Sequence, residues 1–407
     1  MKPTRARYWV VVFALALAMI MYIQRVAISQ AAGPISVELG LSKTQMGVVF
    51  GAFGLSYALF EIPMGLLGDR LGVRWILTQV VLFWSLFTAL TGGAWNLVSL
   101  WVIRFAFGAG EAGCFPNLTR MLSSWLPLSE RVKAQALMWA FGRWGGAAAP
   151  PVAFLVISLF GWRLGFVALS FLGVAWVSIF LLWFKNDPAE HKSVNAAELA
   201  LLEKSRALVL HDHGVPWYRL LLQRDIAVLG LQYFCFSYTW YFYVTWLPTW
   251  LRQAHGLSAG ATAGYAVLPL LLGGFGSIVS GWIPLSVPRR WVAITGFLGT
   301  AVLILVIPGV QDVKVAMALM AMASFCSDLT MPISWNTCVE IGKQYTATVS
   351  STMNMLGNFA GFVAPVLGGF ILDRTGNNWD VVLYTMSAAA FVSAVCWLFI
   401  DPDKSRA

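Results

Sequence analysis

YWVVVFALALAMIMYIQRVAISQAAGP, residues 8–34, is apolar along almost its whole length. About 20 consecutive apolar residues are enough for a helix to cross a bilayer, so this stretch predicts a transmembrane helix. Arg25 lies inside it, and a charge at the centre of such a helix costs on the order of 3 kcal/mol. The run is too long for a cleaved signal peptide, and another apolar run follows directly. The stretch therefore predicts a retained span whose charge needs a partner.

Similar apolar runs recur along the rest of the chain. Of the 407 residues, 59% are hydrophobic and 11% are charged, whereas soluble domains carry roughly 25% charged residues. The runs predict twelve spans, at about 8–34, 44–67, 75–94, 97–120, 132–158, 162–184, 224–250, 260–284, 290–309, 314–340, 346–372 and 380–400.

The longest polar segment divides these spans six and six, and the two halves resemble each other. GRWGGAAAP (142–150) and GNFAGFVAP (357–365) share the spacing from Gly to Ala-Pro, and each falls in the fifth span of its half. Weak internal symmetry of this kind is typical of transporters built from two repeats, with the site at their interface. We therefore predict an all-α membrane protein with twelve transmembrane helices in two pseudo-symmetric six-helix bundles. Its predicted parts are 1–184 (N-terminal bundle), 185–223 (cytoplasmic linker) and 224–407 (C-terminal bundle).

Inside the linker, Asn195-Ala-Ala-Glu198 has the spacing of a capping box that opens a short amphipathic helix. The net charge of +9 does not indicate a nucleic-acid partner, because most Lys and Arg residues fall in segments on the N-terminal side of the bilayer. This positive-inside bias predicts that both termini are cytoplasmic. The five cysteines have no paired spacing and the four histidines fall in loops, so we expect no disulfide framework, metal site or cofactor.

A few ionisable residues fall well inside the predicted spans. Because each is costly facing lipid, they must face one another or an aqueous cavity. They are Arg25, Glu61, Arg104, Glu111, Arg143 and Asp328.

Arg104 and Glu111 are seven residues apart, so they share one helix face about 10.5 Å apart along the axis, too far for a direct pair without long side-chain reach. This arrangement suits capture of an anion by the guanidinium while the carboxyl exchanges a proton, although both groups could instead be satisfied structurally. Glu61 is expected to be structural. For Asp328 the sequence leaves a structural role and proton coupling equally open.

Arg25 has Tyr22 one turn back, and Tyr57 in the second span could supply another hydroxyl. Arginine matches carboxylate or sulfonate oxygens with a planar fork, which lysine cannot do. Arg143 is a third candidate cation for the substrate. In the second half the expected cavity groups are neutral and could bind substrate hydroxyl or keto oxygens: Tyr241, Trp335, Asn354 and Asn358.

GLLGDRLGVRW (65–75) resembles the signature loop of the major facilitator superfamily, through Gly65, Asp69, Arg70, Gly72 and Arg74. A glycine-bearing turn there would let the aspartate and arginines pair and cap helix ends at a cytoplasmic gate. RFAFGAG (104–110) resembles the fourth-span motif of the same superfamily.

Several longer stretches resemble the anion:cation symporter family within that superfamily. They are YIQRVAISQAAGPISVELGLSKTQMGVVFGAFGLSYALFEIP (22–63), RFAFGAGEAGCFPNLTRMLSSWLPLSER (104–131), FKNDPAEHKSVNAAEL (184–199), TWLPTW (245–250) and MNMLGNFAGFVAP (353–365). The family includes proton-coupled importers of hexonates, hexuronates, glucarate, tartrate, phthalate and sulfonated acids. The resemblance implies substrate roles for Tyr22, Arg25, Tyr57 and Arg104, and a proton-coupling role for Glu111.

Three positions depart from the family pattern. Gln24 stands where many such importers have an acidic residue, which leaves Glu111 as the leading coupling group. Glu61 stands where the family often has glutamine, and Arg143 is not general in the family. A third cation could indicate a doubly charged or sulfonate-bearing substrate.

We expect a monomeric secondary transporter in a bacterial-type inner membrane that imports a small organic anion by proton symport and alternating access. An exporter or exchanger is the alternative. A non-transporting membrane sensor would need a signalling domain, for which the spans leave no residues. An enzyme would need clustered nucleophiles, bases or metal ligands, and the spans contain no histidine.

Overall fold

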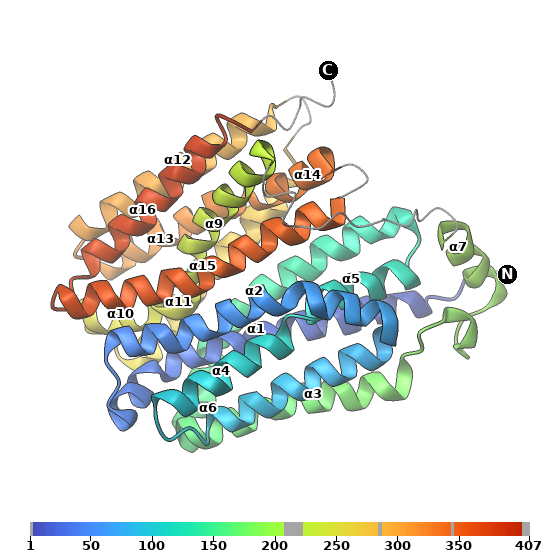
Figure 1. Ribbon diagram of the computed structural model, residues 1–407, viewed down its shortest axis with the longest axis horizontal. Coiled ribbons are helices and arrows are strands. Elements are labelled where there is room, and N and C mark those ends of the chain that lie inside the picture. The colour runs from blue at the N-terminus through green and yellow to red at the C-terminus, as the bar shows by residue number, and fades with distance from the viewer. Residues whose placement is uncertain (1–2, 207–222, 284–286, 343–345, 401–407) are drawn as a thin grey trace.

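The computed structural model describes residues 3–206, 223–283, 287–342 and 346–400, except for the side chains of 62, 65–66, 68–70, 128, 132, 203–206, 339, 342 and 346–348 within helices. All regular structure in these ranges is helical (Figure 1). The first half contains α1 (Ala6–Leu39), α2 (Lys43–Leu71), α3 (Val73–Thr91), α4 (Leu97–Glu111), α5 (Cys114–Trp125) and α6 (Leu128–Trp183). The linker contains η1 (Pro188–Glu190) and α7 (Ala196–Arg206). The second half contains α9 (Arg224–Thr245), α10 (Leu247–Ala254), α11 (Ala259–Ser280), α12 (Arg289–Val306), η2 (Ile307–Gly309), α13 (Val313–Asp328), α14 (Met331–Gly342), α15 (Thr346–Arg374) and α16 (Trp379–Cys396).

These helices make the twelve predicted transmembrane spans. Nine helical segments of the described chain are long and apolar enough to cross a membrane. One of them, α6, crosses twice, because its backbone changes direction at Gly161, where φ is +72°. Helix α2 and the pair α9–α10, which carry polar groups toward the centre of the molecule, complete the twelve. Three spans are each broken into two helices, at α4–α5, at α9–α10 and at α13–α14.

The two halves lie side by side (Figure 1). Within the first half α1 packs on α6, and within the second half α11 packs on α13 and α12 on α16. The seam between the halves is formed by α2 against α15 and by α6 against α11. The linker helix α7 and the start of α1 lie together at one end of the bundle, which we call the linker end. The other end is the opposite end.

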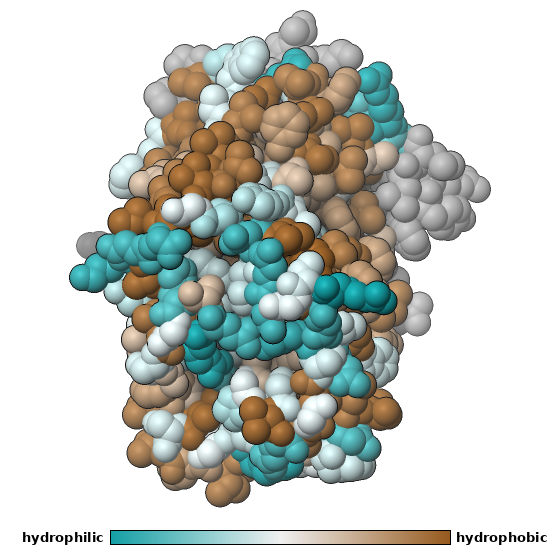
Figure 2. All heavy atoms as spheres, turned by 90° about the vertical axis from the view of Figure 1, so that its left-hand side faces the viewer, coloured by the Kyte–Doolittle hydropathy of each residue, from teal (hydrophilic) through white to brown (hydrophobic). Residues whose placement is uncertain are grey.

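The outward faces of the helices are apolar. Leu86 on α3, Phe171 on α6, Val302 on α12 and Phe391 on α16 are each more than half exposed. Soluble monomers rarely expose such extensive apolar surface, whereas lipid requires it. Figure 2 looks onto the opposite end, where hydrophilic residues gather across the middle of the face and apolar residues cover its flanks. This distribution is that of a helical bundle with lipid around its sides and water at its end.

Close backbone approach joins α2 to α15 between the opposite end and the centre. A Cβ at Gly54 would lie 2.7 Å from the Cα of Gly361, so only glycine permits the contact. At the opposite end, the Asp373 carboxylate accepts hydrogen bonds from the backbone N–H groups of Lys43 (3.1 Å) and Thr44 (2.7 Å). A residue of one half thus satisfies free amides at the start of a helix in the other, which closes the seam at this end.

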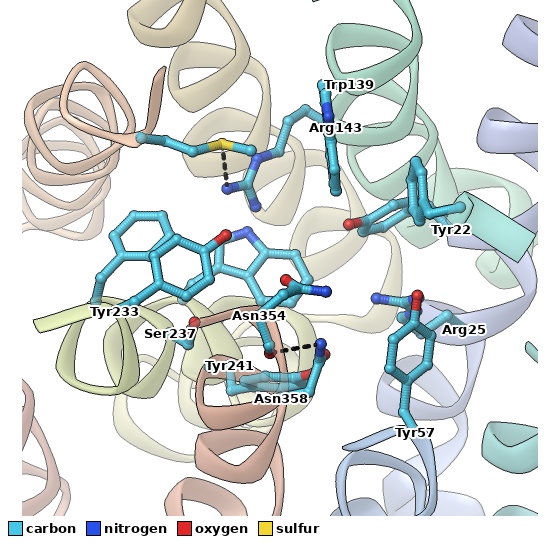
Figure 3. A pocket seen from close by; sticks show the side chains of 15 residues that line it. Tyr22, Arg25, Tyr57, Trp139, Arg143, Tyr233, Ser237, Tyr241, Asn354 and Asn358 are labelled. Atoms are coloured by element: carbon cyan, nitrogen blue, oxygen red, sulfur yellow. Dashed lines mark hydrogen bonds between the residues drawn. The ribbon is translucent and has the colours of Figure 1, made fainter. Parts of the chain in front are cut away.

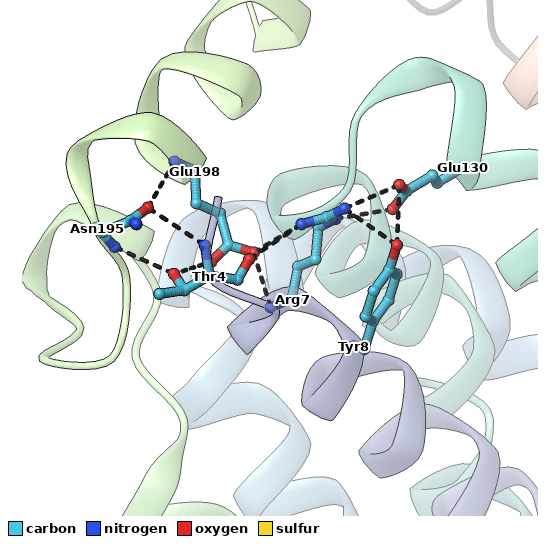
Figure 4. Close-up of polar contacts among 6 residues, drawn as sticks. All are labelled: Thr4, Arg7, Tyr8, Glu130, Asn195 and Glu198. Atoms are coloured by element: carbon cyan, nitrogen blue, oxygen red, sulfur yellow. Dashed lines mark hydrogen bonds and ion pairs between the residues drawn. The ribbon is translucent and has the colours of Figure 1, made fainter. Parts of the chain in front are cut away.

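The linker helix is attached to the first half by a polar cluster (Figure 4). Asn195 Oδ1 accepts from the Glu198 backbone N–H (2.9 Å), so the predicted N-cap is present. The Glu198 side chain accepts from the Arg7 guanidinium (3.0 Å) and from Thr4 Oγ1. Arg7 also pairs with Glu130 (2.9 Å) at the start of α6. A buried carboxylate gains more from a cation and a hydroxyl than from a single backbone amide, so the linker end ties α1, α6 and α7 together.

The signature loop forms the predicted turn between α2 and α3. Gly72 has a φ of +80°, a conformation that favours glycine. The Arg74 backbone N–H donates to Asn186 Oδ1 (2.8 Å), and its guanidinium donates to the Leu181 carbonyl (2.6 Å) near the end of α6. The described part of the structure does not include the side chains of Asp69 and Arg70, and it gives Gly65 only as a residue of α2. The gating contacts predicted for these residues therefore stay predictions.

The glycine contact in the seam predicts a stability difference between two matched variants. Gly54→Ala should lower the free energy of unfolding by about 1–3 kcal/mol, because the added methyl group overpacks a backbone contact. Gly264→Ala on α11, where a Cβ would meet nothing within 4 Å, should leave stability unchanged or raise it through helix propensity. Thermal unfolding in detergent measures both variants. Equal stability of the two proteins would contradict the close contact.

Candidate functional site

A cavity of about 50 Å³ lies between the halves near the middle of the helices (Figure 3). A single water needs about 10–15 Å³ of such space, so the cavity has room for a few waters. A small acid can enter only if the walls move. The first half contributes the residues Tyr22, Arg25, Tyr57, Phe115, Trp139 and Arg143. The second half contributes Tyr233, Phe236, Ser237, Trp240, Tyr241, Met331, Asn354, Gly357 and Asn358.

Arg25 is the centre of the cationic wall. Its Nε donates to Glu111 Oε1 (2.6 Å), and the two side chains form an ion pair that is almost completely buried. The guanidinium carbon also lies 4.5 Å from the ring centre of Tyr22 and 5.1 Å from that of Tyr57. Contacts of this kind between a desolvated cation and a ring face are worth up to about 2 kcal/mol. The sequence-predicted trio of Tyr22, Arg25 and Tyr57 is therefore brought together at the cavity, with Glu111 as the partner of the arginine.

A second buried ion pair crosses the seam. Arg143 Nη2 on α6 lies 2.6 Å from Asp328 Oδ1 on α13, and its guanidinium carbon lies 4.8 Å from the Trp240 ring centre. The other Asp328 oxygen, Oδ2, has no hydrogen-bond partner among the described residues. An anion in the cavity can thus reach Arg143 only in competition with a carboxylate of the opposite half.

The two paired carboxylates occupy equivalent places in the two halves. Glu111 is the last residue of α4, directly before the break that leads to α5, and Asp328 is the last residue of α13, before the break that leads to α14. A buried carboxylate at the break of a span is therefore a structural feature that the two halves share.

A third carboxylate, Glu61, binds amides instead of a cation. Asn354 Nδ2 donates to its Oε1, and Asn358 Nδ2 lies 3.4 Å from its Oε2. The Tyr241 hydroxyl donates to Asn358 Oδ1 (2.9 Å), which orients that amide. Glu61 belongs to the first half and the two asparagines to the second, so this contact also crosses the seam. Three of the four residues predicted for the second half, Tyr241, Asn354 and Asn358, line the cavity.

Two predicted substrate residues lie behind the cavity wall. Arg104 is buried with its guanidinium carbon 4.3 Å from the Phe107 ring centre, and its Nε has no hydrogen-bond partner among the described residues. Arg104 does not line this cavity, since its guanidinium packs against the rings of Phe53 and Phe107, and its predicted contact with the anion stays a prediction. Trp335 is similarly set back, and its Nε1 donates to the hydroxyl of Tyr233 (3.2 Å), which does line the cavity.

Sequence reasoning found Tyr241 but missed the other cavity residues on its face of α9, and one turn of α6. Tyr233, Ser237 and Tyr241 follow each other at intervals of four, so they form one stripe, and all three line the cavity. That spacing inside the aromatic run YFCFSYTWYFY (233–243) was the available signal. Trp139, one turn before Arg143, lies at the cavity wall for the same reason of helical spacing.

Gln24 lies beside Arg25 in sequence but points away from the cavity wall. Its amide donates to the Leu169 carbonyl (2.6 Å) and accepts from Trp84 Nε1 (2.7 Å). A carboxylate could not donate the first of these bonds, so the amide fits its buried surroundings. No group of three metal-ligating side chains occurs in the described ranges.

The fold and the cavity can now be set beside known proteins. The sequence profile of the Major Facilitator Superfamily matches residues 14–365 and 289–407. The chain belongs to the major facilitator superfamily. Its fold is also that of a bacterial homolog to the human lysosomal transporter Spinster, solved in an inward-facing and occupied conformation, with a TM-score of 0.77 at 19% identity over 98% of this chain and 97% of that one.

The curated relatives are transporters of organic and sugar acids. The probable sulfoacetate transporter SauU of Cupriavidus necator is 33% identical, over 94% of this chain and 91% of that protein. The hexuronate transporter of Bacillus subtilis is 29% identical, over 97% and 94%. The probable galactarate/D-glucarate transporter GarP of Escherichia coli is 28% identical, over 100% and 97%. This superfamily member is therefore a membrane transporter and not an enzyme, and the family predicted from its motifs is confirmed.

The ion pair across the seam predicts a strongly coupled double-mutant cycle. Arg143→Met should lower the free energy of unfolding by about 3–5 kcal/mol, because it leaves the Asp328 carboxylate buried without a cation. Adding Asp328→Asn should recover most of that loss. The measurement is thermal or denaturant unfolding of the purified single and double variants. Additive effects of the two changes would show that the pair does not contribute as a unit.

Proposed function

We propose that this transporter imports a small organic anion, a carboxylate, sugar acid or sulfonate, together with protons, by alternating exposure of the central cavity. The observation that supports this most directly is Arg25, a buried guanidinium at the cavity wall whose counter-ion is the equally buried Glu111. The names of the curated relatives support the substrate class. We further propose a bacterial-type inner membrane, cytoplasmic termini and a monomer.

The Arg25–Glu111 pair gives a physical reason for proton coupling. An acid that takes the place of Glu111 at Arg25 leaves the Glu111 carboxylate buried without its cation. Such an unpaired charge costs several kcal/mol. Glu111 Oε2 has no hydrogen-bond partner among the described residues that could offset this cost. Taking up a proton removes the charge, so substrate binding and protonation of Glu111 favour each other.

The closed seam between the cavity and the opposite end supports alternating access. Helices α2 and α15 touch from Asp373 to Gly361, and Arg252 of α10 donates to the Gln30 carbonyl of α1 (3.3 Å). A substrate can bias the two access states only through its different affinity for them. A negatively charged substrate that takes the place of Glu111 at Arg25 and of Asp328 at Arg143 would supply such a difference in affinity.

Substitution of either of two buried arginines of the first half should stop uptake, whereas substitution of a half-exposed arginine should not. Arg25→Ala should reduce uptake by about 100-fold or more, because a buried charged contact with the substrate is lost. Arg104→Ala should also abolish uptake, because it removes a buried cation that lies over the same Phe53 ring as Arg25. Arg163→Ala, at the half-exposed pair with Glu38, is the control and should transport normally. Uptake of labelled sulfoacetate, hexuronate and D-glucarate into cells measures all three. Normal uptake by either test variant would remove that residue from the mechanism.

Substitution of the coupling carboxyl should change the driving force more than the binding. Glu111→Gln should keep substrate counterflow in liposomes but lose one coupled proton. The accumulation ratio supported by a gradient of one pH unit should then fall about tenfold, since each coupled proton contributes about 1.4 kcal/mol per pH unit. Counterflow without any response of the wild type to a pH gradient would favour an exchanger instead.

A further inference from the structure

Glu61 differs from the other two buried carboxylates of the seam in having no cation. Glu111 and Asp328 each form an ion pair with an arginine, whereas no ion pair of Glu61 occurs among the described residues. Its side chain is only 6% exposed. Burying a carboxylate is expensive unless hydrogen bonds replace its water, and a carboxylate offers about four acceptor sites. The two amides of Asn354 and Asn358 are the donors that Glu61 has.

Those two amides belong to the wall of the substrate cavity. Asn354 and Asn358 lie one turn apart on α15 and both line the cavity, beside Tyr241 (Figure 3). A substrate oxygen that used either amide would therefore compete with Glu61 for the same N–H group. The competition has the same form as that between the substrate and Glu111 for Arg25, except that the contested partner is neutral.

The other ionisable groups near Glu61 include one cation, Arg25, which already has a carboxylate partner. They are Arg25 on α1, Tyr57 one turn earlier on α2, and Tyr241 on α9. Arg25 is already bound to Glu111, and the Tyr241 hydroxyl donates to Asn358. Once released from the amides, the Glu61 carboxylate would be a buried charge without a counter-ion, and binding a proton is the change that restores neutrality.

We propose that Glu61 is a second proton-coupling residue of this transporter, which ties the two halves together through Asn354 and Asn358 when empty and takes up a proton when the substrate claims those amides. The proposal rests on the proposed function and adds a residue for which the sequence interpretation expected only a structural role. It also predicts that the protein takes up two protons when the substrate binds, one at Glu111 and one at Glu61.

The test is the pH dependence of binding, with the probe acid that the wild type takes up among sulfoacetate, hexuronate, L-galactonate and D-glucarate. Each proton taken up with the ligand makes Kd tenfold tighter per unit fall in pH, over the range in which the released carboxyl titrates. Glu61→Gln, which keeps the size and a hydrogen-bonding amide but cannot titrate, should reduce the slope of log Kd against pH by about one. Proton uptake on adding the probe to weakly buffered protein, followed with a pH indicator, should fall by about one per bound probe.

Two further variants make the result specific. Glu61→Asp, which restores a carboxyl, should recover the slope even if its affinity is weaker. Glu38→Gln at the opposite end, where the carboxylate binds Trp162 and Arg163, should leave the slope unchanged. An unchanged slope and proton count in folded Glu61→Gln would overturn the role of Glu61 while leaving the transporter proposal standing. A wild type that takes up none of the four acids would overturn the proposed function, and this inference with it.

Discussion

The cost of burying charge in a membrane governs the centre of this protein. Arg25 and Arg143 are each held by a carboxylate from a different helix. The first pair joins α1 to α4 within one half, while the second joins α6 to α13 across the seam. Because each cation is already paired, an anion that enters competes with a carboxylate for the guanidinium. Stability and substrate recognition therefore depend on the same contacts.

The two halves divide the site between them by chemistry. The first half contributes both cavity arginines, whereas the second contributes amides, hydroxyls and aromatic rings from α9 and α15. The glycine contacts of α2 with α15 let the two walls approach closely. A charged wall facing a neutral hydrogen-bonding wall suits a substrate with an acid group at one end and oxygens along its length, as the sugar acids named for the curated relatives have.

Much of this arrangement could be predicted from the sequence, because apolar length and composition determine the spans and their grouping into two halves. The cost of charge in lipid likewise identified six buried ionisable residues. The choice of partners could not be predicted. Arg25 and Glu111 are 86 residues apart, and whether Arg104 or Arg25 faces the cavity depends on the rotation of each helix about its axis, which side-chain packing sets. Glu198 illustrates the same limit at the linker end, since its ion pair joins it to Arg7, 191 residues away in the sequence.

The contact of Asp373 with the start of α2 involves peptide groups and not side chains. The acceptor is the side chain of Asp373, whereas the donors are backbone N–H groups, which any amino acid except proline supplies at positions 43 and 44. During evolution those two positions can therefore drift without opening the closed end, while position 373 cannot. Homologous chains that have lost the acid there should have found another way to hold the two helices together.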